Sequence, residues 1–579
     1  MARRFAVIAL LLAGVFTASA HAQPVALIPG LTYQRQVQFT LHGPVGINVL
    51  IAPKPVGLWS LQPVLSNEQI PGTEKLTAIE QRLSGAVTTA GVSGDITAAG
   101  GRPDGFLMRN GVLDHAPRTA RTSIGVDTSG LLHLDRLSLY GYWQGTGTRH
   151  AFTLLNEPPP SGSSTLYTAS WGPATPAASN SVAVVLDPFP AAAADTDLVG
   201  TSVQVVPGGA ASIPSGGAVL VARGSAAAAL QAEAPVGAAV HVRFELLPDW
   251  PAASVTSGLG GGPLLVANGK PVLNAGESIP VLGLALPEPR TAVGQRADGS
   301  IVMVTVDAGL PGGGLTNFEL AQTLVRLGVV TGAALASGAQ SGMAFEGRLL
   351  SSPPPGGEQA IADALLLEYS GVYLSLPSAS VVSPNGDGVD DTESFTYKVV
   401  RPSTVAVQLV GPDGVARVST QTQLGAGTYP FQWNALRADG TPELEGAWHL
   451  TVSAVDDLGR SSSVERDFSV DLTLGSPAPV SPALVVPRRK ARPVATFALT
   501  RRARVTERIE TPGGVLVRRL GTVTTGPGKL SVAWNGTYSS GAVVYSGRYV
   551  AHVVAQSAIG TSDLSAPFTV RRRATPPPK

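Results

Sequence analysis

Residues 287–350 constrain the fold of this chain most, because three strong local signals follow one another there. Residues 300–307 are almost wholly apolar up to a final aspartate, which is typical of a strand buried on both faces. A glycine-rich turn follows at residues 309–314. Thr316 and Glu319 then stand at the spacing of a capping box, ahead of apolar residues with helical period. The segment predicts a strand, a turn and a helix, with polar groups gathered at the turns.

Four motifs of this segment carry a family resemblance. In order they are PRTAVG from Pro289, VTVDAG from Val304, TNFELAQTLVRLG from Thr316 and ALASGAQSGMAFEGRLL from Ala334. Together they resemble the last third of the phosphodiester glycosidase family. The resemblance implies a hydrolase that cleaves the bond between a sugar's anomeric carbon and a phosphodiester.

Weaker matches extend the resemblance over roughly residues 28–372. Gly94 and Asp95 fit a turn of the family, Arg121 precedes a Ser-x-Gly strand, and Gly261 and Gly262 belong to a glycine turn. We therefore expect an α+β phosphodiester glycosidase-like domain at residues 23–376.

The resemblance also implies a set of site residues. Hydrolysis of a glycosyl bond generally uses two carboxyl groups, for which Asp95 and Asp307 are the candidates. A guanidinium suits a pair of phosphodiester oxygens. The expected substrate-binding residues are Arg121, Arg290, Thr291, Gly261, Gly262, Ser337 and Gly338. Structural readings stay open, since Asp95 can cap a turn and Arg290 can pair with an acid of its own layer.

The chain departs from the family pattern in a way that leaves two functions open. Ala336 stands where the family has an aspartate, Ser93 replaces an asparagine, and Ile96 and Thr97 replace aromatic residues. The first hypothesis is an active hydrolase of sugar phosphodiesters in cell-envelope or extracellular glycans. The second is an inactive relative that binds glycan phosphate, or adheres to a surface through its other modules.

The first residues predict export. Arg3 and Arg4 precede an apolar run at residues 5–16, and Ala20-His21-Ala22 resembles a cleavage site. Residues 1–22 are expected to be a secretory signal peptide, and the run is too short for a membrane span. A secreted protein, in part wall-associated, is the expected outcome. The absence of cysteine excludes disulfides and a cysteine nucleophile.

The C-terminal part repeats itself. Trp433-Asn434 and Trp534-Asn535 each precede a glycine and an alternating strand at equal spacing, and each follows a Pro-x-Gly turn. Such units suit all-β Ig-like sandwiches, and they resemble the Ig-like domain of the flagellar hook-capping protein. We expect modules at 377–474 and 494–572, a proline-rich linker at 475–493 and a disordered tail at 573–579.

Two further features of this part suggest ligands. Asn385, Asp387 and Asp390 surround glycines, so they are candidate calcium ligands, with an Asx-rich turn as the alternative. Residues 476–579 carry 16 Lys and Arg against three acids, which favours contact with an anionic wall polymer, a solvated basic face being the alternative. No aromatic-basic signature of nucleic-acid binding is present in the sequence.

Overall fold

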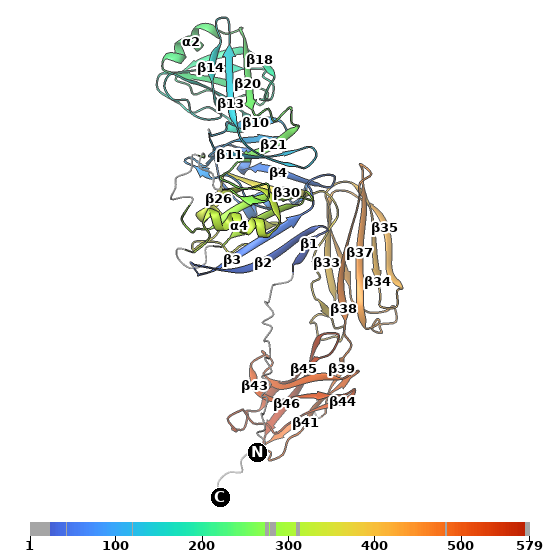
Figure 1. Cartoon of the computed structure of the whole chain (residues 1–579). Helices are drawn as coiled ribbons and strands as arrows, with labels where there is room; N and C mark the ends of the chain where they lie inside the picture. The colour runs from blue at the N-terminus through green and yellow to red at the C-terminus, as the bar shows by residue number, and fades with distance from the viewer. Residues whose placement is uncertain are drawn as a thin grey trace, which may run out of the picture. The chain divides into compact units, whose positions relative to one another are not determined.

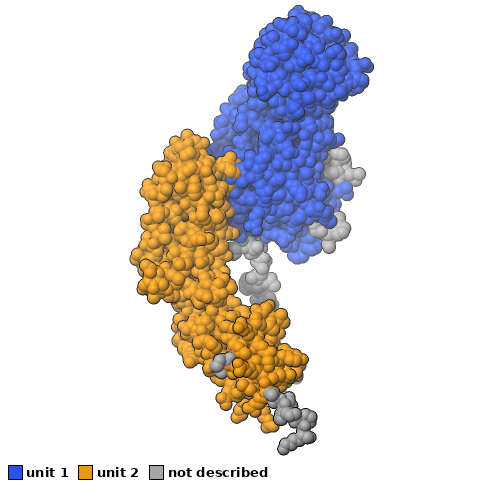
Figure 2. Space-filling view, turned by 180° about the vertical axis from the view of Figure 1, so that it is seen from behind, with its two compact units in different colours: residues 1–84, 89–369 blue, residues 85–88, 370–579 orange. Residues whose placement is uncertain are grey.

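The computed structural model describes residues 24–41, 43–118, 120–272, 277, 285–307, 313–480 and 483–573. The chain divides into two compact units, residues 1–84 with 89–369 and residues 85–88 with 370–579 (Figure 2). The predicted signal peptide, the tail after Arg573 and most of the glycine turn at 309–314 lie outside the described residues. No helix among the described residues is long and apolar enough to cross a membrane.

The first unit contains an eight-stranded sheet that includes three strands from residues 287–350. Its strands, in spatial order, are β1 (Val25–Ile28), β2 (Leu31–Thr40), β3 (Gly43–Ala52), β25 (Ile301–Val306), β24 (Arg290–Arg296), β26 (Val329–Ser337), β22 (Leu264–Ala267) and β23 (Lys270–Pro271). Every residue of β25 is buried, which confirms the expected strand. Helix α4 (Asn317–Arg326) begins at the capping box formed by Thr316 and Glu319, also as predicted.

Helix α4 is a crossover connection within this sheet. Strands β25 and β26 both pair antiparallel with β24, so they run in the same direction with β24 between them. A connection between two such strands must cross the sheet face, and α4 does so against β22 and β26 (Figure 1). Its apolar side contributes Leu320, Ala321 and Leu324 to the core below the sheet.

Three further sheets complete the larger part of this unit. One has five strands in the order β10 (Val112–His115), β9 (Leu107–Arg109), β21 (Val255–Gly260), β11 (Thr122–Asp127), β12 (Leu132–Arg136). A second has five in the order β28 (Arg348–Leu349), β27 (Met343–Phe345), β6 (Thr88–Ser93), β30 (Asp363–Tyr369), β4 (Trp59–Leu65). The third has eight in the order β14 (His150–Phe152), β13 (Ser138–Gln144), β20 (Ala239–Leu247), β18 (Asp197–Pro207), β17 (Ser181–Leu186), β19 (Ala218–Arg223), β16 (Ser164–Thr168), β15 (Leu154–Leu155).

The expectation of an α+β domain is wrong, because the first unit is predominantly β. The described α-helices there are α1 (Leu76–Leu83), α2 (Ser225–Glu233) and α4, of 8, 9 and 10 residues. The α+β prediction extended the pattern of one strand–turn–helix segment to the whole domain. Most of the remaining chain alternates short strands with glycine and proline turns, which build sheets without needing helices to cover them.

The second unit holds two pairs of sheets. The first pair is β31 (Tyr373–Leu374), β33 (Glu393–Val399), β36 (Gly427–Trp433) against β32 (Val381–Val382), β38 (Ser461–Val470), β37 (Gly446–Asp456), β34 (Ser403–Val410), β35 (Ala416–Leu424). The second pair is β39 (Leu474–Pro479), β41 (Arg492–Leu499), β44 (Gly528–Trp534) against β40 (Leu484–Val486), β46 (Thr561–Arg572), β45 (Gly547–Gln556), β42 (Ala503–Glu510), β43 (Leu516–Thr525).

Each pair of sheets encloses its own apolar core, as in a β-sandwich. Trp448 packs in the first core and Trp534 in the second, and both are almost fully buried. The repeated tryptophans Trp433 and Trp534 end equivalent strands, β36 and β44. The likeness to the Ig-like domain of the hook-capping protein stays a prediction.

Candidate functional site

Two aspartates, Asp95 and Asp363, lie against each other in the core of the first unit. Asp95 follows β6, and Asp363 is the first residue of β30, the neighbour of β6 in its sheet. The Asp95 amide donates to Asp363 Oδ1 at 2.7 Å, and both side chains are fully buried. The Oδ2 atom of each carboxyl has no hydrogen-bond partner among the described residues. Such oxygens are rare in folded proteins, and a functional role is one reason to retain them.

Arg121 connects this pair to the surface of the unit. Its Nη2 donates to Asp95 Oδ1 at 2.8 Å, and its Nη1 donates to Asp104 Oδ2 at 2.5 Å. Asp104 Oδ1 accepts from Arg118 at 3.1 Å, and the Arg118 side chain is 49% exposed. The four side chains form a continuous polar network, here called the Asp95 network: Asp95, Arg121, Asp104 and Arg118. It leads from a fully buried acid to an exposed guanidinium.

Burial and charge give the two buried acids different protonation states. Burial and the neighbouring charge of Asp95 raise the pKa of Asp363 to about 8. Burial also raises the pKa of Asp95, but the Arg121 guanidinium opposes the shift. Asp363 therefore keeps its proton at neutral pH, while Asp95 is the partner that pairs with Arg121 as a carboxylate.

Three glycines allow the chain to approach these carboxyls closely. A Cβ atom on Gly260 would lie 2.3 Å from Asp95 Oδ2, and one on Gly105 would lie 2.8 Å from the same oxygen. A Cβ on Gly94 would lie 2.1 Å from Asp363 Oδ1. Since non-bonded atoms do not approach so closely, glycine at these positions is a packing requirement of the site.

A cleft of about 540 Å³ adjoins the exposed end of the network. Arg118 belongs to its lining, together with His115, Tyr140 and Glu157. His115 is buried, which lowers the pKa of its imidazole, and its Nδ1 lies 2.6 Å from the carbonyl oxygen of Gly105. The cleft thus offers a cationic side chain, Arg118, which pairs with Asp104, and an acidic one, Glu157.

The predicted glycine turn lies next to Asp95. Gly261 donates its amide to the Thr122 carbonyl at 3.0 Å, and Gly262 donates to the Ala334 carbonyl at 2.8 Å. Ala336, in place of the family aspartate, donates its amide to the Gly94 carbonyl at 2.8 Å. The turn is therefore part of the site's frame, but the amides of Gly261 and Gly262 already have backbone acceptors.

Asp307 lies outside the Asp95 network. Its Oδ1 accepts from Asn48 at 2.8 Å and from the Ser352 amide at 2.9 Å, and its Oδ2 accepts from Arg35 at 3.0 Å. Among the described residues it makes no hydrogen bond to Asp95 or Arg121. The structure does not join Asp95 and Asp307 as a pair of neighbouring acids.

Arg290 also lies elsewhere, with the remaining predicted residues beside it. Its guanidinium pairs with Glu288 at 2.8 Å and donates to backbone carbonyls, and burial lowers its pKa. Ser337 is its partner in strand register, and the Gly338 amide donates to the Pro289 carbonyl. Thr291 is fully buried within β24. The alternative in which Arg290 pairs with an acid of its own layer matches this geometry.

Sequence reasoning missed Asp363, Asp104 and Arg118. Asp363 opens β30 and is followed by four apolar residues, and an acid at the start of such a run is a usable signal. Asp104 lies between Pro103 and Gly105 in the segment Gly101-Arg102-Pro103-Asp104-Gly105. Neither residue shows its partner in the sequence, because the partner lies on another segment: Asp363 contacts Asp95, and Asp104 contacts Arg118 and Arg121.

The candidate calcium segment forms a tight turn. Asn385 Oδ1 accepts the Asp387 amide, Asp387 Oδ1 accepts the Val389 amide, and the Asp391 carboxylate accepts two glycine amides. This is the hydrogen-bonding of an Asx-rich turn. The calcium role of Asn385, Asp387 and Asp390 stays a prediction.

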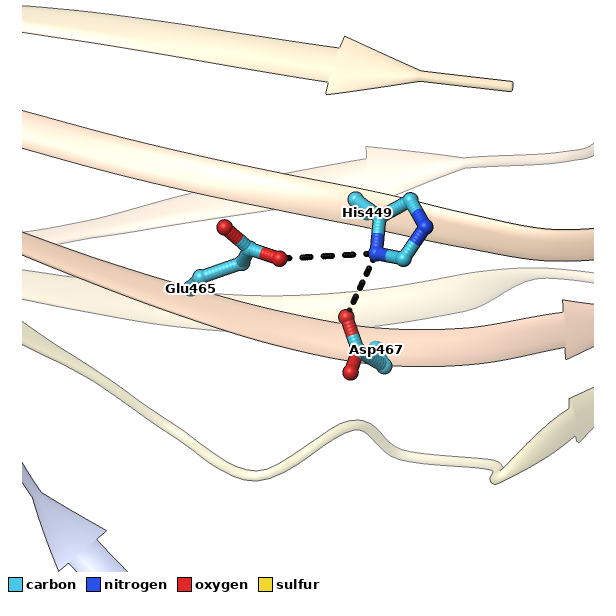
Figure 3. Close-up of side chains that lie close together, drawn as sticks. All are labelled: His449, Glu465 and Asp467. Atoms are coloured by element: carbon cyan, nitrogen blue, oxygen red, sulfur yellow. Dashed lines mark hydrogen bonds and ion pairs between the residues drawn. The ribbon is translucent and has the colours of Figure 1, made fainter. Parts of the chain in front are cut away.

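A different group of potential metal ligands among the described residues consists of His449, Glu465 and Asp467. Figure 3 shows both carboxylates directed at one ring nitrogen of His449. That nitrogen, Nδ1, lies 2.7 Å from Asp467 and 3.4 Å from Glu465. All three side chains are exposed, and direct contacts to a shared nitrogen describe a surface ion pair.

Residues 192–368 match the model of the phosphodiester glycosidase family. The matched segment includes the glycine turn at 260–263, Asp307, Ala336 and Asp363, whereas Asp95 and Arg121 precede it. A segment of this chain therefore has the sequence of a phosphodiester glycosidase domain.

Two individual proteins resemble this chain over part of its length. An uncharacterized protein of a Bacillus subtilis prophage, YomE, is 33% identical over 87 residues, which are 15% of this chain and 14% of that protein. A hypothetical protein from Synechocystis has a similar structure, with a TM-score of 0.52 and 23% identity over 60% of this chain and 63% of that one. The chain thus spans less than two thirds of either relative.

A zebrafish structure was also found, the catalytic domain of N-acetylglucosamine-1-phosphodiester alpha-N-acetylglucosaminidase, auto-inhibited by its pro-peptide. It aligns with a TM-score of 0.33 at 11% identity, over 60% of this chain and 86% of that one.

Proposed function

We propose that this chain is an exported hydrolase that cleaves the bond between a sugar and a phosphodiester in envelope or extracellular glycans. The observation that carries the proposal is the Asp95 network, which places Arg118 in the lining of a cleft and joins it through Asp104 to Arg121. The family match at residues 192–368 supports the reaction class. An envelope glycan is the expected substrate of an exported protein.

The chemistry of this bond suits such a network. A phosphate monoester leaves far more readily than an alcohol, so its departure depends more on cations than on a proton donor. Arg118, at the cleft, and Arg121 behind it are the proposed cations, because guanidinium groups bind phosphate oxygens in pairs. The site then needs one carboxylate to activate water at the anomeric carbon.

Asp104 is the proposed base, and Asp95 and Asp363 are proposed as positioning residues. The Asp104 side chain is 26% exposed, whereas the two other acids are fully buried. Asp95 fixes the Arg121 guanidinium, and Asp363 fixes the Asp95 backbone through the amide hydrogen bond. The alternative, with Asp95 and Asp307 as the catalytic acids, predicts that Asp307→Asn abolishes sugar release in the same assay, whereas the present proposal predicts that it does not.

One observation favours a second candidate, an inactive protein that binds glycan phosphate. Gln340 accepts the amide of Thr97 at 3.1 Å, so its side chain lies against the turn that follows Asp95. The cavity next to it, lined by Ser93 and Gln340, measures only about 10 Å³. Ala336, at the place of the family aspartate, is itself fully buried.

The test is sugar release from a defined substrate. The full chain is incubated with N-acetylglucosamine 1-(methyl phosphate) and with a teichoic acid fragment, and free sugar is measured. We expect hydrolysis, with Asp104→Asn lowering kcat at least about 100-fold, as loss of a general base does. Arg118→Gln should lower kcat as well, because this guanidinium is proposed to assist departure of the phosphate.

A matched control is Asp127→Asn. Asp127 is a largely buried, hydrogen-bonded aspartate at the far end of β11, so its loss perturbs the same sheet without touching the network. Its activity should stay at the wild-type level. Absence of sugar release from the wild-type chain, with retained binding of the substrate, would establish the second candidate.

A further inference from the structure

A carboxylate of the chain itself occupies a set of converging donors beside the Asp95 network. Glu277 Oε1 accepts the Leu264 amide at 2.7 Å and the Thr122 hydroxyl at 2.9 Å. Its Oε2 accepts the Thr122 amide at 3.1 Å. Two backbone amides and a hydroxyl that point at one anion form the type of concave site that also binds phosphate.

The donors belong to the same strand ends that frame the candidate site. Thr122 opens β11 and directly follows Arg121, and Leu264 opens β22 after the glycine turn. Gly260, two residues before Gly262, contacts Asp95, and a Cβ on Gly262 would lie 2.5 Å from Glu277 Oε2. Consecutive residues on both segments therefore serve the acid network and this anion site.

The donors and the occupant differ in how the fold holds them. Thr122 is buried. It pairs with Arg136 of β12, and its carbonyl accepts the amide of Gly261, the residue after β21. Glu277 comes from the connection between β23 and β24 and belongs to no strand or helix. The donor geometry is thus set by the sheets and does not depend on Glu277.

We propose that the Thr122 and Leu264 donors form a phosphate subsite and that the Glu277 carboxylate is its internal competitor. This rests on the proposed function, since it assigns the phosphate of that substrate to a place next to Arg121. A phosphodiester anion would accept hydrogen bonds from the two amides and the hydroxyl. Occupation by Glu277 and by phosphate exclude each other, because they use the same hydrogen atoms.

Direct binding tests the subsite without requiring hydrolysis. Dimethyl phosphate, a non-hydrolysed phosphodiester without a sugar, is titrated into the full chain and its Glu277→Ala variant, and the dissociation constants are measured by calorimetry. We expect Glu277→Ala to bind at least about tenfold tighter, since an attached competitor has a high effective concentration. In the double variant Glu277→Ala with Thr122→Val the gain should disappear.

Two outcomes would overturn the proposal. Equal affinity of the wild type and Glu277→Ala for dimethyl phosphate would show that the donors do not bind it. Tighter binding that survives Thr122→Val would place the anion elsewhere.

A second measurement covers the case in which Glu277→Ala does not fold. High concentrations of dimethyl phosphate are added to the wild-type chain, and the amide resonances of Thr122 and Leu264 are followed by NMR. Shifts at both amides would support the subsite, and no shift at either would exclude it. Since neither experiment measures sugar release, an inactive chain could still bind phosphate here, and an active chain could fail to do so.

Discussion

At the scale of single residues, the clearest feature is that two aspartates in contact are held in different states. Asp95 has the Arg121 guanidinium at 2.8 Å, whereas the partner of the Asp363 carboxyl among the described residues is the Asp95 amide at Oδ1. An ion pair favours the charged form of an acid, and burial without one favours the neutral form. Placement relative to one arginine therefore decides which acid carries the proton.

This difference predicts a stability that falls as pH rises. The pKa of Asp363 is about 8 in the folded chain and about 3.9 in an unfolded one. The folded state therefore holds this proton more tightly, and the stabilisation is complete below about pH 4 and is lost as pH rises through about 8. The first unit should unfold at lower urea concentration at pH 9 than at pH 6, measured by pulse proteolysis.

The Asp363→Asn variant isolates this contribution. Asparagine is neutral at every pH, so the variant should lose the part of the pH dependence between about 4 and 8 that belongs to Asp363. If wild type and variant show the same dependence on pH, then Asp363 is not protonated in the folded chain.

At the scale of elements, strand ends and glycines build the candidate site. β6, β11, β21, β22 and β30 each begin or end at it, and they come from three different sheets. Glycine at the crossing points lets these ends meet at van der Waals distance around Asp95. The site therefore depends on backbone packing as much as on its charged side chains.

Gly260→Ala is expected to destabilise the first unit by about 1–3 kcal/mol, the usual cost of forcing a methyl group into a packed core. The new Cβ would meet Asp95 Oδ2 at 2.3 Å and the Gly105 Cα at 2.9 Å, and the latter is backbone that cannot rotate away. Urea unfolding measures the loss. Gly216→Ala is the control, because its Cβ would have no atom within 4 Å, and its stability should change little. Equal stability of the two variants would contradict the packing argument.

How much the sequence predicts also differs between elements. α4 and β25 were predicted because their signals, the capping box and the apolar run, are local. The pairing of Asp95 with Asp363 was not, because it joins residues 268 positions apart through the register of two strands. Glu277 was missed for the same reason, since its donors lie on strands of different sheets. The prediction of an α+β domain was wrong because a few local helical signals do not reveal how many strands surround them.

At the scale of the whole molecule, charge is distributed unevenly along the chain. Residues 476–579 hold 16 of the 41 Lys and Arg residues and only three acids, while the chain as a whole has a net charge of +1. This part contains the second sandwich of the second unit. A basic surface of this kind attracts anionic polymers over about a Debye length.

We therefore expect the full chain to be retained on immobilised teichoic acid at low salt and released as ionic strength rises. Screening weakens contacts between exposed charges, so the salt concentration needed for release should fall when Arg488, Arg489, Lys490 and Arg492 are changed to glutamine. Column elution measures it. The control variant carries Lys54→Gln and Arg35→Gln, which remove positive charges from the first unit. It should elute like the wild type. Elution that does not depend on salt would rule out an electrostatic contact.

The pairing of β3 with β25 joins two strands that are synthesised at different times. Asn48 and Asp307, which are joined by a hydrogen bond, lie 259 positions apart in the chain. At about 5–20 residues per second, roughly 10–50 s pass between the making of the two partners. Throughout that interval β3 has an unpaired edge with apolar side chains, which is the kind of surface that associates with other chains. A cell that makes this protein must keep its first strands unfolded or protected until the fourth strand of the sheet exists.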